Sequence, residues 1–214
     1  MTSDRTVDHW VIDFTVDGDI RFVSHRDMLR LFGRAVVRAK LPIRYSEGFN
    51  PRPKLSLPLP RPVAVASNAE RLVLELTGQV SAEHVLTRLG EQMPEGIELV
   101  AARQVQPGQG GSPQTVRYRL TLPISDPEAV ARRAVVLLDP CPALVKRTNP
   151  KTGKTKDLDI RPFMESIEVG HNQIDMVLRV TPNGSARPGE VAIALGLDAH
   201  RVNHRVRRLE VQWQ

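Results

Sequence analysis

The chain has 214 residues, a length that fits one large domain or two domains of about 100 residues each. Its single cysteine, Cys141, excludes an internal disulfide framework and a cysteine-ligated iron–sulfur cluster, because either needs more than one thiol. No run of about 18 apolar residues is present to span a membrane, and the first residues lack the apolar core of a signal peptide. We therefore expect a cytoplasmic protein.

The positive charge of the chain is concentrated in one segment. The formal net charge is +6, which favours a polyanionic partner. Residues 24–61 hold nine basic and two acidic residues, a local balance of +7, so the rest of the chain sums to −1. A binding surface for a polyanion is therefore expected in this segment.

The first half of the chain predicts a strand–helix–strand–strand–helix–strand order. Residues 9–24 alternate apolar and polar side chains around a Val-Asp-Gly-Asp turn, and predict a strand that folds over at its end. After the first helix, the chain leads into the second strand. Residues 70–78 and 96–105 predict further strands, and residues 81–93 predict a second helix capped by Ser81.

The segment 24–41 predicts the first helix. Ser24 and Asp27 have the spacing of a capping box, and Leu41-Pro42 ends the helix. The residues expected to face inward recur at spacings of three and four: Leu29, Phe32, Val36 and Ala39.

Residues 106–114 contain three glycines and two prolines and predict a flexible connector between domains. The expected domains are residues 1–106 and 115–214, joined by 107–114. The second half then predicts a strand, a helix capped by Ser125, a hairpin, a strand, a helix opened by Pro188 and a last strand, at residues 115–123, 125–138, 143–160, 173–182, 187–197 and 204–213. Together the two halves predict an α+β fold with two ferredoxin-like β-α-β-β-α-β halves, each with an antiparallel sheet.

Several classes of enzyme site have no counterpart in the sequence. There is no phosphate-binding loop, no dinucleotide fingerprint after a strand and no zinc-type Cys or His spacing. His200 and His204 are four residues apart without a nearby acid, and are interpreted as solvated loop residues. We expect neither a metal nor a cofactor.

Four arginines of the first helix recur every four residues and form a stripe along one side. This arginine stripe consists of Arg26, Arg30, Arg34 and Arg38. It is either a solvated face paired with acids elsewhere in the fold, or a row of guanidinium groups for phosphates, which they can bind bidentately. Only Asp27 can relieve the repulsion within the helix, through Arg30.

The stretch after this helix, RYSEGFNPRPK, is rich in proline, aromatic and basic residues. Tyr45 and Phe49 either pack into the core of a rigid connection or stack on nucleic-acid bases. In the second case Arg44, Arg52 and Lys54 would contact the phosphates, with Asn50 beside them. Gly48 permits a positive φ, and Asn50-Pro51 and Pro53 hold a turn.

These residues resemble the radical-SAM-linked protein family, bacterial domains found fused to or encoded beside cobalamin-binding radical SAM proteins. The resemblance is carried by Ser24, His25, Asp27, Arg30, Phe32, Arg34, Ala35, Leu41, Pro42, Tyr45, Ser46, Gly48, Phe49, Asn50, Pro51, Pro53 and Lys54. Later features are similar too: Asp159, Arg161, Pro162, Arg187, Pro188 and Glu190. The resemblance implies a radical SAM protein as partner, and no reaction.

Three functions are compatible with these features. The first is a non-catalytic accessory module that binds or presents an RNA substrate. The second is a metal-independent ribonuclease resembling CRISPR repeat-processing endonucleases, with His25 as general base and Lys54 stabilising the charged phosphate. The third is a protein–protein adaptor that docks on an acidic partner. We favour the first.

Overall fold

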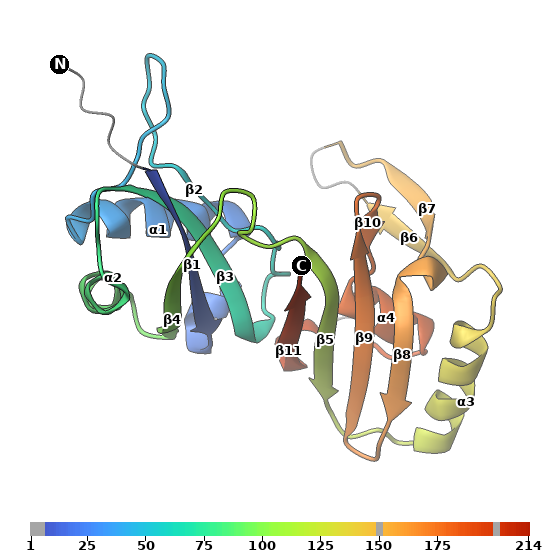
Figure 1. Ribbon diagram of the computed structural model, residues 1–214. Helices are drawn as coiled ribbons and strands as arrows, with labels where there is room; N and C mark the ends of the chain where they lie inside the picture. The colour runs from blue at the N-terminus through green and yellow to red at the C-terminus, as the bar shows by residue number, and fades with distance from the viewer. Residues whose placement is uncertain (1–6, 149–151, 199–201) are drawn as a thin grey trace. The chain divides into compact units, whose positions relative to one another are not determined.

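The computed structural model describes residues 7–148, 152–198 and 202–214. Within these residues the fold is α+β, with four α-helices and a mostly antiparallel arrangement of strands (Figure 1). No described helix is long and apolar enough to cross a membrane. Two features singled out in the sequence, His200 and the tip of the hairpin at 149–151, lie outside the described residues.

The chain divides into two compact units. The first unit comprises residues 1–113 together with Trp213 and Gln214, and the second comprises residues 114–212. Each unit has its own helices and strands, and each is described by itself below.

The strands of the first unit are β1 (Val7–Val16), β2 (Leu55–Ser56), β3 (Ala66–Thr77) and β4 (Ile97–Val105). Their order across the sheet is β4-β1-β3-β2, and all three neighbouring pairs are antiparallel. The two strands that precede the helices, β1 and β3, therefore lie side by side at the centre. The expected second strand is present, and it is only two residues long.

Both helices of the first unit, α1 (His25–Arg38) and α2 (Ala82–Gly90), pack on the same face of this sheet. Phe32 of α1 is fully buried, with its ring 4.9 Å from the ring of Phe14 in an edge-to-face contact. Leu29, expected to face inward, is only partly buried, because Met28 occupies the inward position in its place.

The start of α1 follows the capping pattern with one difference. The Ser24 hydroxyl accepts a hydrogen bond from the Asp27 backbone N–H at 3.2 Å, as a cap does. The difference is at Asp27, whose carboxylate accepts a hydrogen bond from the same Ser24 hydroxyl at 2.7 Å.

The prediction that the first strand folds over at its end is wrong. The strand ends at Val16, and residues Gly18–Phe22 form a 3₁₀ turn, η1. Gly18 has a φ of +57°, and the Asp17 side chain accepts from its N–H at 2.9 Å. This local cap favours a tight turn over a continued strand.

The second unit contains the strands β5 (Pro113–Thr121), β8 (Met164–Val169), β9 (Gln173–Thr181) and β11 (Val206–Trp213). They lie in the order β11-β5-β9-β8, and a two-residue strand, β10 (Gly184–Ser185), pairs antiparallel with the last residues of β9. The pairs β5–β9 and β8–β9 are antiparallel. The strand β8 was not predicted from the sequence.

The hairpin predicted at 143–160 is present as a separate two-stranded sheet, formed by β6 (Leu144–Thr148) and β7 (Thr155–Asp159) (Figure 1). It precedes β8 and is therefore additional to the four main strands of the unit.

The helices of the second unit are α3 (Pro127–Leu138) and α4 (Pro188–Ala194), and both begin with a proline in the first turn. The prediction of Ser125 as the cap of α3 is wrong. The cap is Asp126, whose carboxylate accepts from the Ala129 N–H at 2.9 Å. Aspartate and serine are about equally good caps, so the choice depends on where the backbone turns.

Two glycines of the predicted connector pack closely against the first unit. A Cβ on Gly110 would lie 2.9 Å from the Val73 side chain, and one on Gly111 would lie 2.8 Å from the Trp213 ring. Gly111 also has a φ of +109°. These positions require glycine for close approach as well as for backbone freedom.

Candidate nucleic-acid interface

The segment 44–54, here called the aromatic loop, forms a narrow hairpin that extends from the first unit (Figure 1). Its base is joined to β3 by hydrogen bonds from Arg44 N to Glu75 O at 2.8 Å and from Glu75 N to Lys54 O at 3.1 Å. Lys54 N also donates to Arg44 O at 2.8 Å, which closes the two arms. The loop is therefore anchored at its base by backbone pairing.

The arms of the aromatic loop are paired for several residues beyond this base. Tyr45 and Pro53 form an isolated antiparallel bridge, and Ser46 N donates to Arg52 O at 2.8 Å. Arg52 N donates in turn to the Ser46 hydroxyl at 3.0 Å. Only the tip, residues 47–51, lacks this pairing, and there Gly48 adopts a φ of +118°.

Neither aromatic ring of this loop belongs to the core. Phe49, at the tip, has a relative exposure of 105%, and Tyr45 is 43% exposed. Asn50 and Pro51 beside them are exposed as well. Of the two alternatives drawn from the sequence, the packing of both rings into the core is wrong.

The cations of the loop differ in how far they are neutralised. The Arg44 guanidinium lies 2.9 Å from the Glu75 carboxylate, and the Lys54 ammonium lies 3.8 Å from the same group. Glu47 adds a distant contact to Arg44 at 3.9 Å. The Arg52 side chain is exposed and makes no hydrogen bond or ion pair within the described residues.

All four members of the arginine stripe are exposed on α1. Arg30 forms the expected ion pair with Asp27 at 2.9 Å, and Arg38 donates to the side chain and the carbonyl of Gln92. Arg26 and Arg34 make no hydrogen bond or ion pair within the described part of the chain. Among the described residues, the stripe therefore pairs with one acid, which lies within the helix.

Asp27 responds to this positive surrounding. Hydrogen bonds from Ser24 and then Arg30, together with the nearby charges of Arg30 and Arg26, lower the pKa of its carboxyl. The field along this side of α1 thus favours negative charge.

His25 is not a plain solvent-facing residue. It is partly buried and lines a small cavity together with Phe14, Met28, Arg61 and Glu70. Burial lowers the pKa of the imidazole, and the negative charge of Glu70 acts in the opposite direction. Burial at this position therefore favours the uncharged imidazole.

The structure does not bring His25 and Lys54 together. His25 lies near Glu70 on the face of β3 that packs against α1, whereas Lys54 contacts Glu75. These two glutamates are five positions apart on one strand, so they point to opposite faces and lie about 16 Å apart along it. A general base at His25 and a charge stabiliser at Lys54 therefore do not share one site.

Sequence reasoning missed the role of Arg61. It is 8% exposed, and its guanidinium donates to the carbonyls of Arg21 at 2.8 Å, Val65 at 2.5 Å and Val23 at 3.4 Å. It holds the chain that leads into α1. The signal was present as a charged residue among apolar ones in the segment 57–65.

The family-like residues of the second unit are structural anchors. Asp159 accepts from the backbone N–H groups of Ala143 at 2.8 Å and Arg161 at 3.0 Å. The Arg161 guanidinium donates to three backbone carbonyls, those of Leu138, Asp139 and Met164. These contacts connect the end of α3, the hairpin and β8.

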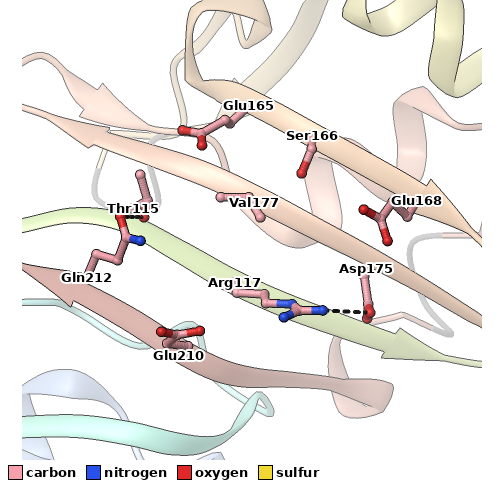
Figure 2. Close-up of a pocket in the computed structure, with 9 residues that line it drawn as sticks. All are labelled: Thr115, Arg117, Glu165, Ser166, Glu168, Asp175, Val177, Glu210 and Gln212. Carbon is pink, nitrogen blue, oxygen red and sulfur yellow. Dashed lines mark hydrogen bonds and ion pairs between the residues drawn. The ribbon is translucent and has the colours of Figure 1, made fainter.

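A charged hollow of about 300 Å³ lies on the sheet of the second unit, over β5, β8, β9 and β11. Figure 2 shows Arg117 reaching toward Asp175, with Glu168 and Glu210 at its edges. Arg119 donates two hydrogen bonds to Asp175, at 2.7 and 2.6 Å. These hydrogen bonds are the main reason that the pKa of the Asp175 carboxyl is lowered. Sequence reasoning did not anticipate this hollow, because its residues come from four separated strands.

The hollow offers no metal site. Nowhere in the described ranges do three or more His, Cys, Asp or Glu side chains come together in a way that could hold a metal ion.

Comparison with known proteins identifies the family of this chain. No curated protein matches the chain. One similar solved structure is that of an unknown protein from Galdieria sulphuraria, which has 12% sequence identity over 98% of this chain and 99% of that chain. Its TM-score of 0.26 is too low to support a shared fold. Residues 10–188 match the model of a family described as "Uncharacterized protein conserved in bacteria (DUF2344)", and the chain belongs to this family.

Proposed function

We propose that this chain is a non-catalytic module that binds an RNA substrate through α1 and the aromatic loop. The observation that carries the proposal is the Phe49 ring, which is fully exposed at the tip of a loop with a paired backbone. A large apolar ring in water is unfavourable by about 1.5–3 kcal/mol relative to a buried one. A partner that covers the ring would recover this free energy.

The exposed side chains of α1 and of the aromatic loop favour RNA over other partners. Base stacking on an aromatic side chain needs an accessible ring face, and the bases of single-stranded RNA provide the matching surface. The side chains of Arg26, Arg34 and Arg52 are exposed and make no hydrogen bond or ion pair within the described residues, so they remain available to phosphates. Guanidinium groups bind phosphates bidentately.

A role beside a radical SAM protein is part of the same proposal, and it rests on the sequence resemblance of residues 24–54. The module would present RNA to that enzyme in the cytoplasm. Co-purification of the chain with a cobalamin-binding radical SAM protein encoded beside it tests this part. Recovery of the chain alone from cells that express both proteins would contradict it.

We also propose that the two units are ferredoxin-like halves that fold independently. The strand orders β4-β1-β3-β2 and β11-β5-β9-β8 support this proposal, because a β-α-β-β-α-β unit places its first and third strands at the centre. In the second unit, the hairpin β6–β7 would then be an insertion before the second strand of the motif.

The central test is the salt dependence of RNA binding. Each phosphate contact on a single strand contributes about −0.7 to the slope of log K against log salt. The triple variant Arg26→Gln, Arg34→Gln, Arg52→Gln should therefore flatten the slope by about 2. A matched control removes three positive charges elsewhere, through Arg88→Gln, Arg132→Gln and Arg205→Gln, and should leave the slope nearly unchanged.

The outcomes separate the three functions drawn from the sequence. Equal slopes for the triple variant and wild type would show that these three arginines make no phosphate contact. RNA cleavage that persists without divalent ions and is lost in His25→Ala would establish a nuclease. Wild-type protein that binds no RNA would contradict the proposal and leave the protein–protein adaptor.

A further inference from the structure

The hairpin of residues 144–159, here called the basic hairpin, stands apart from the main strands of the second unit (Figure 1). A two-stranded hairpin alone is at best marginally stable in water. Its order in this fold must therefore come from contacts outside its own ladder.

One anchor of the basic hairpin is a bidentate ion pair. The Arg147 guanidinium donates to the two carboxylate oxygens of Glu190, at 2.7 and 2.6 Å, and to Ser185 O at 2.9 Å. Glu190 also accepts from the Arg187 N–H at 2.8 Å at the start of α4. Both charged side chains are mostly buried, with relative exposures of 22% and 11%. The pairing is charge-assisted and bidentate, the strongest class of side-chain hydrogen bond.

The second anchor lies at the base of the hairpin. Ile160 N donates to Ala143 O at 2.9 Å, and Ala143 N donates to the Asp159 carboxylate at 2.8 Å. Together the two anchors position the hairpin.

The remaining charge of the hairpin is positive and exposed. Residues 144–156 contain five basic residues and no acidic one. Glu190 neutralises Arg147, and Lys146 lies across the ladder from Asp157. The side chains of Lys154 and Lys156 are exposed and make no hydrogen bond or ion pair to the described residues.

Lys156 also lies directly across the ladder from Arg147. Glu190 already neutralises Arg147, so Lys156 has no acidic residue opposite it in the ladder. A polyanion bound at this position would supply the missing negative charge.

We infer that the basic hairpin is a second phosphate-contacting surface for RNA, located in the second unit. This inference rests on the proposed function of the first unit. The hairpin contains no aromatic residue, so it offers no stacking surface for bases. Lysine binds phosphate as a point charge, and the contact would therefore be independent of the RNA sequence.

The test measures RNA binding of the full chain with a labelled single-stranded RNA over a range of salt concentrations. The double variant Lys154→Gln, Lys156→Gln should weaken binding and flatten the slope of log K against log salt by about 1.4. Its control, Arg132→Gln with Arg205→Gln, removes the same charge from α3 and the turn at Asn203–Arg205, and should bind like wild type. RNAs of different sequence should lose affinity by the same factor.

The failure of this inference differs from the failure of the proposed function. If wild type binds RNA and the Lys154/Lys156 variant shows the wild-type slope, the hairpin makes no phosphate contact and the inference is refuted alone. If both double variants lower the slope equally, only general charge matters and the inference is also refuted. If wild type binds no RNA, this inference and the proposed function are both refuted.

Discussion

Truncation of Phe49 should separate binding from stability. Because the ring has a relative exposure of 105%, Phe49→Ala removes no buried apolar surface, and the free energy of unfolding should change by less than about 0.5 kcal/mol. Loss of one stacked base should cost about 1–3 kcal/mol of RNA binding. This corresponds to a rise in Kd of about 5- to 150-fold.

The matched control is a buried phenylalanine of the same unit. Phe32 on α1 is 0% exposed, so Phe32→Ala should lower the free energy of unfolding by about 3–5 kcal/mol. Phe49→Ala should therefore weaken RNA binding with little change in stability, whereas Phe32→Ala should lower stability. Urea unfolding measures stability, and fluorescence anisotropy of a labelled single-stranded RNA measures affinity.

Two further substitutions at position 49 identify the kind of contact. Phe49→Tyr keeps an aromatic face and should retain most of the affinity, whereas Phe49→Leu keeps apolar area without the face and should lose it. Wild-type affinity in Phe49→Ala would refute stacking. A large loss of stability in the same variant would show that the ring packs against the protein.

The remaining predictions concern stability. Burial lowers the pKa of His25 below its ordinary value, so the unfolded chain takes up this proton at higher pH than the folded chain, and stability should fall as the pH drops through about 6.5. Urea midpoints of His25→Gln should fall less over the same range, and parallel curves for the two proteins would contradict the lowered pKa. Gly111→Ala should cost about 1–3 kcal/mol, because its Cβ would meet the Trp213 ring at 2.8 Å and its φ is +109°. Gly108→Ala, with a φ of +83° and open space around it, should cost only about 1 kcal/mol, and equal losses for the two would show that the contact with Trp213 is unimportant.

The sequence by itself determined most of the local structure. It located the start of α1 at Ser24 and the second helix with its Ser81 cap, because capping and amphipathic spacing act within a few residues. The predicted stop at Leu41-Pro42 is wrong, because α1 ends at Arg38 and Lys40 already has a φ of +55°. It also located the arginine stripe, since a helix of known position fixes which side chains share a side.

Tertiary structure decided which of these residues are exposed and which are brought together. Phe32 and Phe49 are the same amino acid 17 positions apart, and only the packing of α1 on the sheet buries the first while the loop leaves the second in water. The proximity of His25 to Glu70, and the distance of both from Lys54, follows from the pairing of β3 with its neighbours, which joins residues far apart in the chain. The anchoring of the basic hairpin by Arg147 and Glu190 has the same origin, because those residues are separated by 43 positions. Local signals extend over one or two turns of chain, whereas burial and ion pairing depend on contacts that form only when the sheet is assembled.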